Sequence, residues 1–176
     1  MAVGAAVVFF FVGWYLRILG RKELKEDLRK EVPAASPVTP PFGSSNPEMR
    51  RLQLQAYERL IILCERLALP SLLGRFPVAE MSAAELKASL VQTIKTEFEY
   101  NVSQQLYVSP AAWDGIKNLK EQQIFIVNQL GAMLPPGAGG SVFAKQVAEL
   151  LMHDENATLQ PIIAALLTKE ARQLMQ

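Results

Sequence analysis

The chain has 176 residues, of which 18 are Lys or Arg and 17 are Asp or Glu, so its formal net charge is +1. Charges of both signs alternate along residues 48–176 without forming a basic stripe. This excludes a nucleic-acid-binding function that rests on a concentrated positive surface. The single cysteine, Cys64, excludes a disulfide framework and is typical of a reducing compartment. Because Cys64 shares a helical face with Leu60 and Leu67, we expect it in the core.

The first segment, residues 1–19, has the composition of a transmembrane anchor. No charged side chain occurs from Met1 to Leu16, whereas residues 17–30 hold six Lys or Arg. A spanning helix needs about 20 apolar residues, and residues 2–19 nearly reach this length if Arg17 extends its guanidinium to the headgroups. We expect the side chains at the end of the apolar run to lie at the membrane interface: Trp14, Tyr15, Arg17, Arg21 and Lys22.

The placement of the charges distinguishes this anchor from a cleavable secretory signal. A signal has basic residues before its apolar core and a small-residue cleavage site after it. Here the cations follow the apolar run, and no such site follows Tyr15. By the positive-inside rule, the amino terminus lies outside and the rest of the chain lies in the cytoplasm. The predicted location is the inner membrane of a bacterium, with a cytoplasmic C-terminal domain.

Residues 20–47 are predicted to link the anchor to the C-terminal domain. Arg21 to Glu31 form a short solvated helix in this prediction, because opposite charges stand four residues apart along it. The five prolines between residues 32 and 47 favour a semi-extended spacer. A loose P-x-x-P match from Pro37 to Pro40 leaves open a ligand for a peptide-binding module.

Residues 48–176 predict an all-α domain, a bundle of about five helices, because no segment alternates with a period of two. Helix starts are marked by N-cap residues, by proline in the first turn and by a capping box. Prolines and glycines mark the ends. The expected helices run from Asn46-Pro47 to about Leu69, from Ser82 to about Leu106, from Ser109-Pro110 to before Pro135, from Ser141 to about His153, and from Asn156 or Thr158 to Leu174.

Two of these helices carry regular apolar patterns. A stripe from Leu86 to Leu106 recurs every four residues and winds around its helix, since four residues exceed one turn by about 40°. From Ala112 to Met133 the spacing alternates between four and three, which is a heptad seam with one polar member, Gln123. We interpret Gln123 as a packing residue that sets register or oligomer state, or that reaches a local partner or solvent.

The second helix also offers the best candidate for a partner or ligand face. Glu97, Asn101 and Gln105 stand four residues apart beside the apolar stripe, and Gln104 and Tyr107 lie near its end. A carboxylate, amides and a phenol could converge there. The alternative is a polar seam that specifies helix packing. The chain has one histidine, one cysteine and no Glu-x-x-His pair. We therefore predict no metal, no cofactor and no catalytic residue.

The stretch from Thr96 to Ser109, continued by Ala112-Trp113 and Ile116-Lys117, resembles a family of uncharacterised membrane-anchored proteins of Bacteroidetes-type bacteria. The resemblance extends to residues 58–67 in the first helix and to the turn at residues 153–156. It implies a lineage and an anchor-plus-spacer architecture. It brings no established activity, and therefore no catalytic residue.

These features predict a single-pass membrane protein with a non-catalytic cytoplasmic domain, an accessory or scaffolding subunit of an inner-membrane assembly. Its partners would be the lipid bilayer and other proteins of the assembly or itself, and no nucleic acid. One alternative is a small-ligand sensor or enzyme that uses Glu97, Asn101, Gln105 and Tyr107. Another is a homo-oligomer that pairs through the seam containing Gln123.

Overall fold

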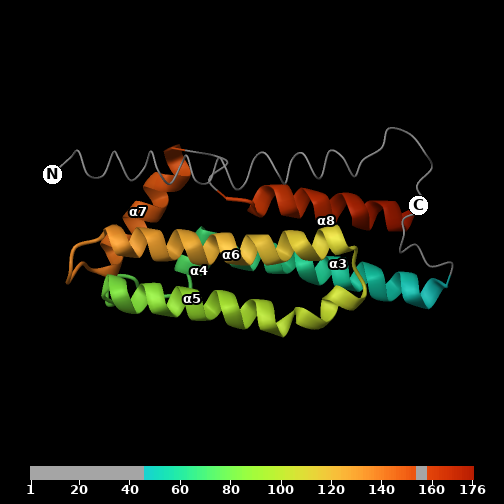
Figure 1. Ribbon diagram of the computed structural model, residues 1–176, viewed down its shortest axis with the longest axis horizontal. Coiled ribbons are helices and arrows are strands. Elements are labelled where there is room, and N and C mark those ends of the chain that lie inside the picture. Colours follow the sequence, from blue (N-terminus) through green and yellow to red (C-terminus); the bar gives the residue numbers. More distant parts are fainter. Residues whose placement is uncertain (1–45, 154–157) are drawn as a thin grey trace. The chain divides into compact units, whose positions relative to one another are not determined.

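The computed structural model describes residues 46–153 and 158–176, and this part of the chain consists of α-helices and one 3-10 helix, without a β-strand. The all-α expectation is therefore confirmed for the described residues. The elements in chain order are α3 (Pro47–Leu67), α4 (Leu69–Leu73), α5 (Ala83–Tyr100), the 3-10 helix η1 (Val102–Leu106), α6 (Pro110–Met133), α7 (Gly140–His153) and α8 (Gln160–Met175) (Figure 1).

The predicted anchor, the charged helix after it and nearly all of the proline-rich spacer lie outside the described residues. Within residues 46–153 and 158–176, no helix is both long and apolar enough to cross a bilayer.

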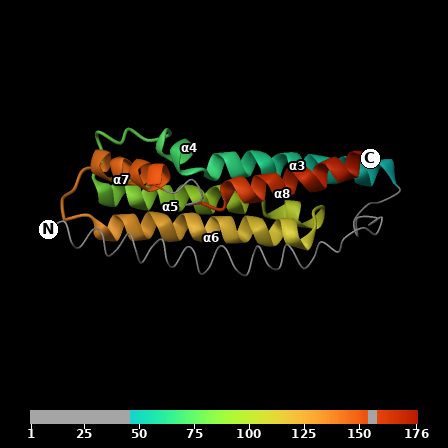
Figure 2. The same cartoon turned by 90° about the horizontal axis from the view of Figure 1, so that it is seen from above.

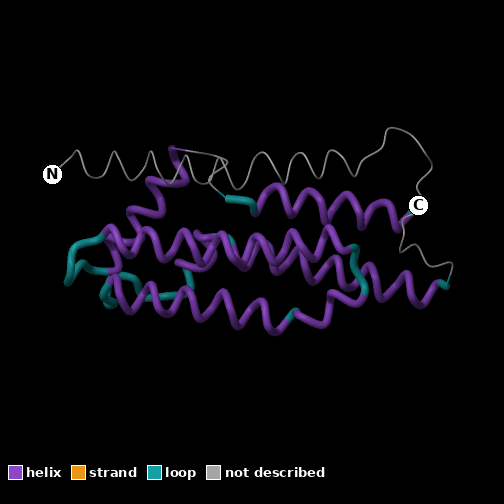
Figure 3. The backbone as a smooth tube through the Cα atoms, in the orientation of Figure 1, coloured by secondary structure: helices purple, strands orange, loops and turns teal. Residues whose placement is uncertain are grey.

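Four long helices, α3, α5, α6 and α8, lie alongside one another, and each runs antiparallel to the one before it (Figures 1 and 2). The most extensive contacts join α3 to α8 and α5 to α6. The shorter helix α7 is inclined to these four and packs on α4, α5 and α6. The α5–α6 and α6–α7 connections lie at opposite ends of the bundle (Figure 3).

The first helix begins as predicted and ends two residues earlier than expected. The Asn46 side chain accepts a hydrogen bond from the Glu48 N–H, and Pro47 occupies the first turn. The helix ends at Leu67, because Ala68 adopts an extended ψ of 132°. Pro70 then lies in the first turn of α4, where its missing N–H costs no hydrogen bond. This extra short helix is the element that the sequence analysis missed.

The second helix has its predicted start and a different end. Ser82 and Glu85 form the expected capping box, with both of its hydrogen bonds present. The helix ends at Tyr100 and continues as η1, so the prediction that it reaches Leu106 is wrong. The Asn101 Nδ2 donates to the Glu97 carbonyl oxygen at 2.8 Å, and the Asn101 N–H bonds three residues back, to Phe98 O. This side-chain competition with the helix ladder tightens the backbone into 3-10 geometry.

The 3-10 geometry changes the burial of the apolar stripe that recurs every four residues from Leu86 to Leu106. Leu86, Leu90 and Ile94 are fully buried, whereas Val102 is 44% exposed and Leu106 is 73% exposed. A 3-10 helix has three residues per turn, so a spacing of four no longer keeps side chains on the face they held in α5. The heptad seam of α6 behaves as predicted instead: its members from Ala112 to Leu130 are all buried, and Met133 is half-buried.

The last two helices differ from the expectation at their starts. The helix α7 begins at Gly140, so Ser141 lies inside it. For α8 the N-cap position is Leu159, and neither Thr158 nor any other local side chain caps it; Asn156 lies outside the described residues. The Leu159 N–H donates instead to the Gln122 Oε1 of α6 at 2.6 Å. A side chain from another helix thus accepts from the N–H of the N-cap residue itself.

Gly140 lies where the loop before α5 meets the loop before α7. The Ala83 N–H donates to Ala138 O at 2.8 Å, and the Gly140 N–H donates to Met81 O at 2.7 Å. A Cβ atom at position 140 would lie 2.5 Å from the Val78 carbonyl oxygen and 3.0 Å from that of Met81. Both are backbone atoms that neighbouring hydrogen bonds and helices hold in place, so a side chain fits only if the two loops separate.

We predict that Gly140→Ala lowers the free energy of unfolding by about 1–3 kcal/mol, the usual cost of overpacking. The matched control is Gly139→Ala, because a Cβ at position 139 meets nothing within 4 Å. Its stability should stay within about 1 kcal/mol of the parent. Urea unfolding of the full chain, followed by circular dichroism, measures both. Equal stability of the two variants would contradict the close approach at Gly140.

Candidate functional site

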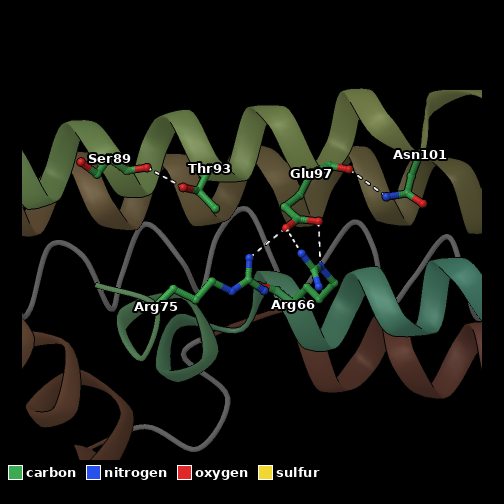
Figure 4. A network of polar contacts seen from close by, with 6 residues as sticks. All are labelled: Arg66, Arg75, Ser89, Thr93, Glu97 and Asn101. Atoms are coloured by element: carbon green, nitrogen blue, oxygen red, sulfur yellow. Dashed lines mark hydrogen bonds and ion pairs between the residues drawn. The ribbon is translucent and has the colours of Figure 1, made fainter. Parts of the chain in front are cut away.

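The carboxylate of Glu97, the leading residue of the predicted face, binds two arginines from other segments (Figure 4). The Arg66 Nε donates to Glu97 Oε2 at 2.8 Å, and Arg66 Nη2 donates to Oε1. The Arg75 Nη1 also donates to Oε1, at 2.8 Å. We call these three residues the Glu97 cluster. It joins the last turn of α3, the loop after α4 and the second half of α5.

The Glu97 side chain is 14% exposed, while the Arg75 and Arg66 side chains are 29% and 51% exposed. The Arg66 hydrogen bond lowers the pKa of Glu97, and it outweighs the opposing effect of burial. The same interaction raises the pKa of Arg66. Arg75 also donates to the Arg66 carbonyl oxygen at 3.1 Å, which satisfies an acceptor in the last turn of α3. The cluster therefore holds an ionised carboxylate and helps to fix the end of a helix.

The remaining residues of the predicted face are distributed around the end of α5. Asn101 is 7% exposed and bonds to the backbone of its own helix, as described above. Gln104 is 8% exposed and donates to the Ser103 Oγ at 3.2 Å. Gln105 is exposed, and Tyr107 is half-buried. The structure thus brings Asn101 to the Glu97 backbone, and the 3-10 geometry of η1 removes the four-residue spacing that would have aligned Gln105 with them.

Gln123 lies in the middle of the α6 seam with none of its surface exposed. Neither atom of its amide has a hydrogen-bond partner among the described residues. The Gln123 side chain therefore does not reach solvent in this conformation. Pairing of two chains through this seam would require the bundle to open, because the seam faces the core of its own chain. Its role in packing or register stays a proposal.

A second polar cluster, which the sequence analysis did not identify, joins three helices. We call Tyr57, Ser109 and Glu170 the Tyr57 cluster. The Tyr57 hydroxyl and the Ser109 Oγ each donate to Glu170 Oε2, both at 2.6 Å. The Ser109 N–H donates to the Tyr57 oxygen at 3.0 Å. The Ser109 Oγ also accepts from the Ala112 N–H at 3.0 Å, as the N-cap of α6.

Both the geometry and the electrostatics of the Tyr57 cluster indicate a role in helix packing. Tyr57 is 3% exposed, and burial, followed by the hydrogen bond to Glu170, raises the pKa of its hydroxyl. The hydroxyl therefore stays protonated and keeps its donor role. A sequence signal for this cluster exists: Ile163, Leu167, Glu170 and Leu174 follow the four-three spacing of a buried seam, and Glu170 is its charged member. A carboxylate at such a position needs donors from neighbouring helices.

The remaining reactive groups support the same interpretation. Cys64 is fully buried, which confirms its expected place in the core, and burial raises the pKa of its thiol to about 12. A thiol with that pKa is a poor nucleophile at neutral pH. In the part of the chain that the structure describes, no group of three or more His, Cys, Asp or Glu side chains is placed to hold a metal ion.

We predict that Tyr57→Phe lowers the free energy of unfolding by about 1–3 kcal/mol, because Glu170 loses one donor and the Ser109 N–H loses its acceptor. Tyr100→Phe is the matched control, since Tyr100 is 76% exposed; its stability should change by no more than about 0.5 kcal/mol. Thermal unfolding of the full chain tests both. The role assigned to the hydroxyl is wrong if the two variants unfold alike.

The Glu97 cluster predicts a pH-dependent contribution to stability. The pKa of Glu97 is lower in the folded chain than in the unfolded chain. Its ionised form therefore stabilises the fold above the unfolded value of about 4.3, and this contribution is lost as the pH falls through the folded value.

Glu97→Gln should therefore cost about 1–2 kcal/mol of stability at pH 7, and the deficit should be smaller at pH 3, where more of the Glu97 carboxyl is protonated. Glu99→Gln, on the exposed side of α5, serves as the control. Urea unfolding at the two pH values supplies the measurement. A deficit of the same size at both would show that the lost interaction is not ionic.

Comparisons with known proteins place almost the whole chain in one family. No curated protein and no solved structure matches it. The model of a family of unknown function, DUF7935, matches residues 3–174. An uncharacterised family is what the resemblance implied, whereas its membrane anchoring and bacterial lineage stay predictions. The chain belongs to the DUF7935 family of unknown function.

Proposed function

We propose that this chain is a membrane-tethered, non-catalytic helical interaction module, an accessory or scaffolding subunit of a bacterial inner-membrane assembly. In this proposal the residues before the helical bundle hold it at the membrane, and the bundle positions partner proteins. The alternative from the sequence analysis is a small-ligand sensor or enzyme that uses the face with Glu97, Asn101, Gln105 and Tyr107.

The state of the Glu97 carboxylate is the observation that favours the interaction module over the enzyme. A general acid or base works best when its pKa lies near the pH at which the protein operates, and burial usually raises a carboxyl towards that range. Arg66 and Arg75 move the pKa of Glu97 in the opposite direction and occupy its oxygens. Asn101 bonds to the backbone of its own helix. Glu97 thus joins three segments and Asn101 bonds within its own helix, and both roles suit a rigid binding module.

The tether rests on the composition of residues 1–30. An apolar run with Trp14 and Tyr15 at its end, followed by six cations, is typical of an uncleaved anchor whose following domain is cytoplasmic. A spacer with five prolines would hold the bundle away from the bilayer, in a position to contact neighbouring proteins.

The full chain, expressed in a bacterium, should remain in the membrane pellet after an alkaline carbonate wash. A variant without residues 2–19 should be recovered in the supernatant, because it lacks the apolar run. In spheroplasts, protease added from outside should leave a tag at the C-terminus intact. Release of the full chain by carbonate argues against the anchor, and digestion of the tag argues against the cytoplasmic orientation.

The same two chains also test the binding function. Affinity purification through the anchored chain, followed by mass spectrometry, should recover membrane proteins in constant proportion to it, and the variant without residues 2–19 should recover fewer. Glu97→Gln should reduce this recovery in step with its loss of folding stability. A variant that folds normally and keeps its partners, but loses a small-molecule turnover, would support the enzyme instead.

A further inference from the structure

The helix α3 carries a second apolar stripe on the side away from the core. Its core face is formed by Gln53, Ala56, Tyr57, Leu60, Leu63, Cys64 and Leu67. The positions Pro47, Arg51, Leu54, Glu58 and Ile61 follow a four-three spacing on the opposite side of the same helix. Such a spacing is the seam by which one helix packs against another. Within the described residues, no helix covers this seam completely, since Leu54 and Ile61 are only half-buried.

This second face forms one wall of a groove with a volume of about 700 Å³. The end of α8 contributes Ala171 and Met175 to its lining, so the groove runs between α3 and α8. We call it the α3 groove. Ile62 on its rim is 51% exposed and Met175 is 66% exposed. Apolar side chains with this much surface in water favour a partner that covers them.

Two charges of opposite sign along the groove would be exchanged by a two-fold rotation. Arg51 and Glu58 both line it, and they stand seven residues apart, which is about 10.5 Å along a helix. They are too far apart to pair within one helix, and in the described part of the chain neither forms an ion pair. Their midpoint falls between Leu54 and Gln55. A second copy of the same helix, laid antiparallel about that midpoint, would bring each Arg51 opposite a Glu58.

We propose that two copies of this chain pair through the α3 groove, with the α3 helices antiparallel about a two-fold axis beside Leu54 and Gln55. Arg51 of each copy then faces Glu58 of the other, and Ile62 of each copy faces the Pro47 end of the other. The α3 and α8 helices of both copies together form a four-helix arrangement. A surface that complements itself in this way is what a two-fold interface requires.

Charge complementarity is the reason to choose a second copy over another occupant. A foreign acidic helix would match Arg50 and Arg51 but would meet Glu58 with a like charge. A copy of this chain, in the register described, places an opposite charge at both Arg51 and Glu58. This inference names a partner for the proposed interaction module and rests on that proposal for its biological meaning. Its test compares the masses of variants that all contain the same residues 1–45, so a failure of the tether and a failure of the pairing give different results.

The test is a charge exchange in the full chain, purified in detergent and measured by sedimentation equilibrium. The parent should be a dimer. Arg51→Glu and Glu58→Arg should each raise the dissociation constant by about tenfold or more, because each places two like-charged pairs in the interface. The double variant Arg51→Glu/Glu58→Arg should restore the parent value to within about threefold, since opposite charges face each other again. Lys145→Glu, on α7, is the control and should have no effect.

A second measurement covers the case in which a charge variant folds poorly. Gln55→Cys places a thiol beside the proposed axis, and a short bis-maleimide should link two such chains. Asn118→Cys on α6 should not be linked, and Cys64 should stay unreactive because it is fully buried. A parent that remains monomeric overturns the proposal, and this includes the case in which residues 1–45 of the same chain fill the groove. Failure of the folded double variant to recover, or equal linking at positions 55 and 118, overturns it as well.

Discussion

The arrangement of the bundle depends on one carboxylate, that of Glu170, which accepts hydrogen bonds from two other helices. The Tyr57 hydroxyl reaches it from α3 and the Ser109 hydroxyl reaches it from the start of α6. Because a half-buried carboxylate loses part of its hydration, α8 gains most from the one placement in which both hydroxyls donate to Glu170. The Leu159 N–H at the other end of α8 bonds to Gln122 of α6. Polar contacts near both ends thus set the position of α8 along the bundle, while apolar side chains supply most of the surface that α8 buries.

The position of α8 determines which side of α3 faces the core and which side faces the α3 groove. The core side of α3 packs on α8, α5 and α6, and the Tyr57 hydroxyl fixes its rotation about its own axis. With that rotation fixed, Leu54 and Ile61 face the α3 groove together with Arg51 and Glu58. A helix with apolar residues on two opposite sides is unusual for a surface helix, which commonly has one apolar stripe. The second stripe is consistent with a module that binds through α3.

Polar groups in this domain contribute to its order in two different ways. The Glu97 cluster places two guanidinium groups on one carboxylate and joins three segments of the chain. Gln123 lies in the seam without a hydrogen-bond partner among the described residues, at a cost in stability. A polar side chain in a seam destabilises those helix registers in which it would pack more closely against apolar side chains. We interpret Gln123 as a residue of this second kind.

The sequence by itself determined the helical class, the core seam of α6 and the starts of α3, α5 and α6. These starts depend on a side chain and an amide only two or three residues apart, such as Asn46 with Glu48 or Ser82 with Glu85, so the local sequence contains the whole interaction. Only the tertiary structure decided which side chain accepts from the Leu159 N–H at the start of α8 and what the Glu97 carboxylate binds. The partners of these groups lie 22 to 37 residues away, as for Arg75 with Glu97 and Gln122 with Leu159. Nothing in the spacing of either partner reveals such a contact, because it exists only once the helices have packed.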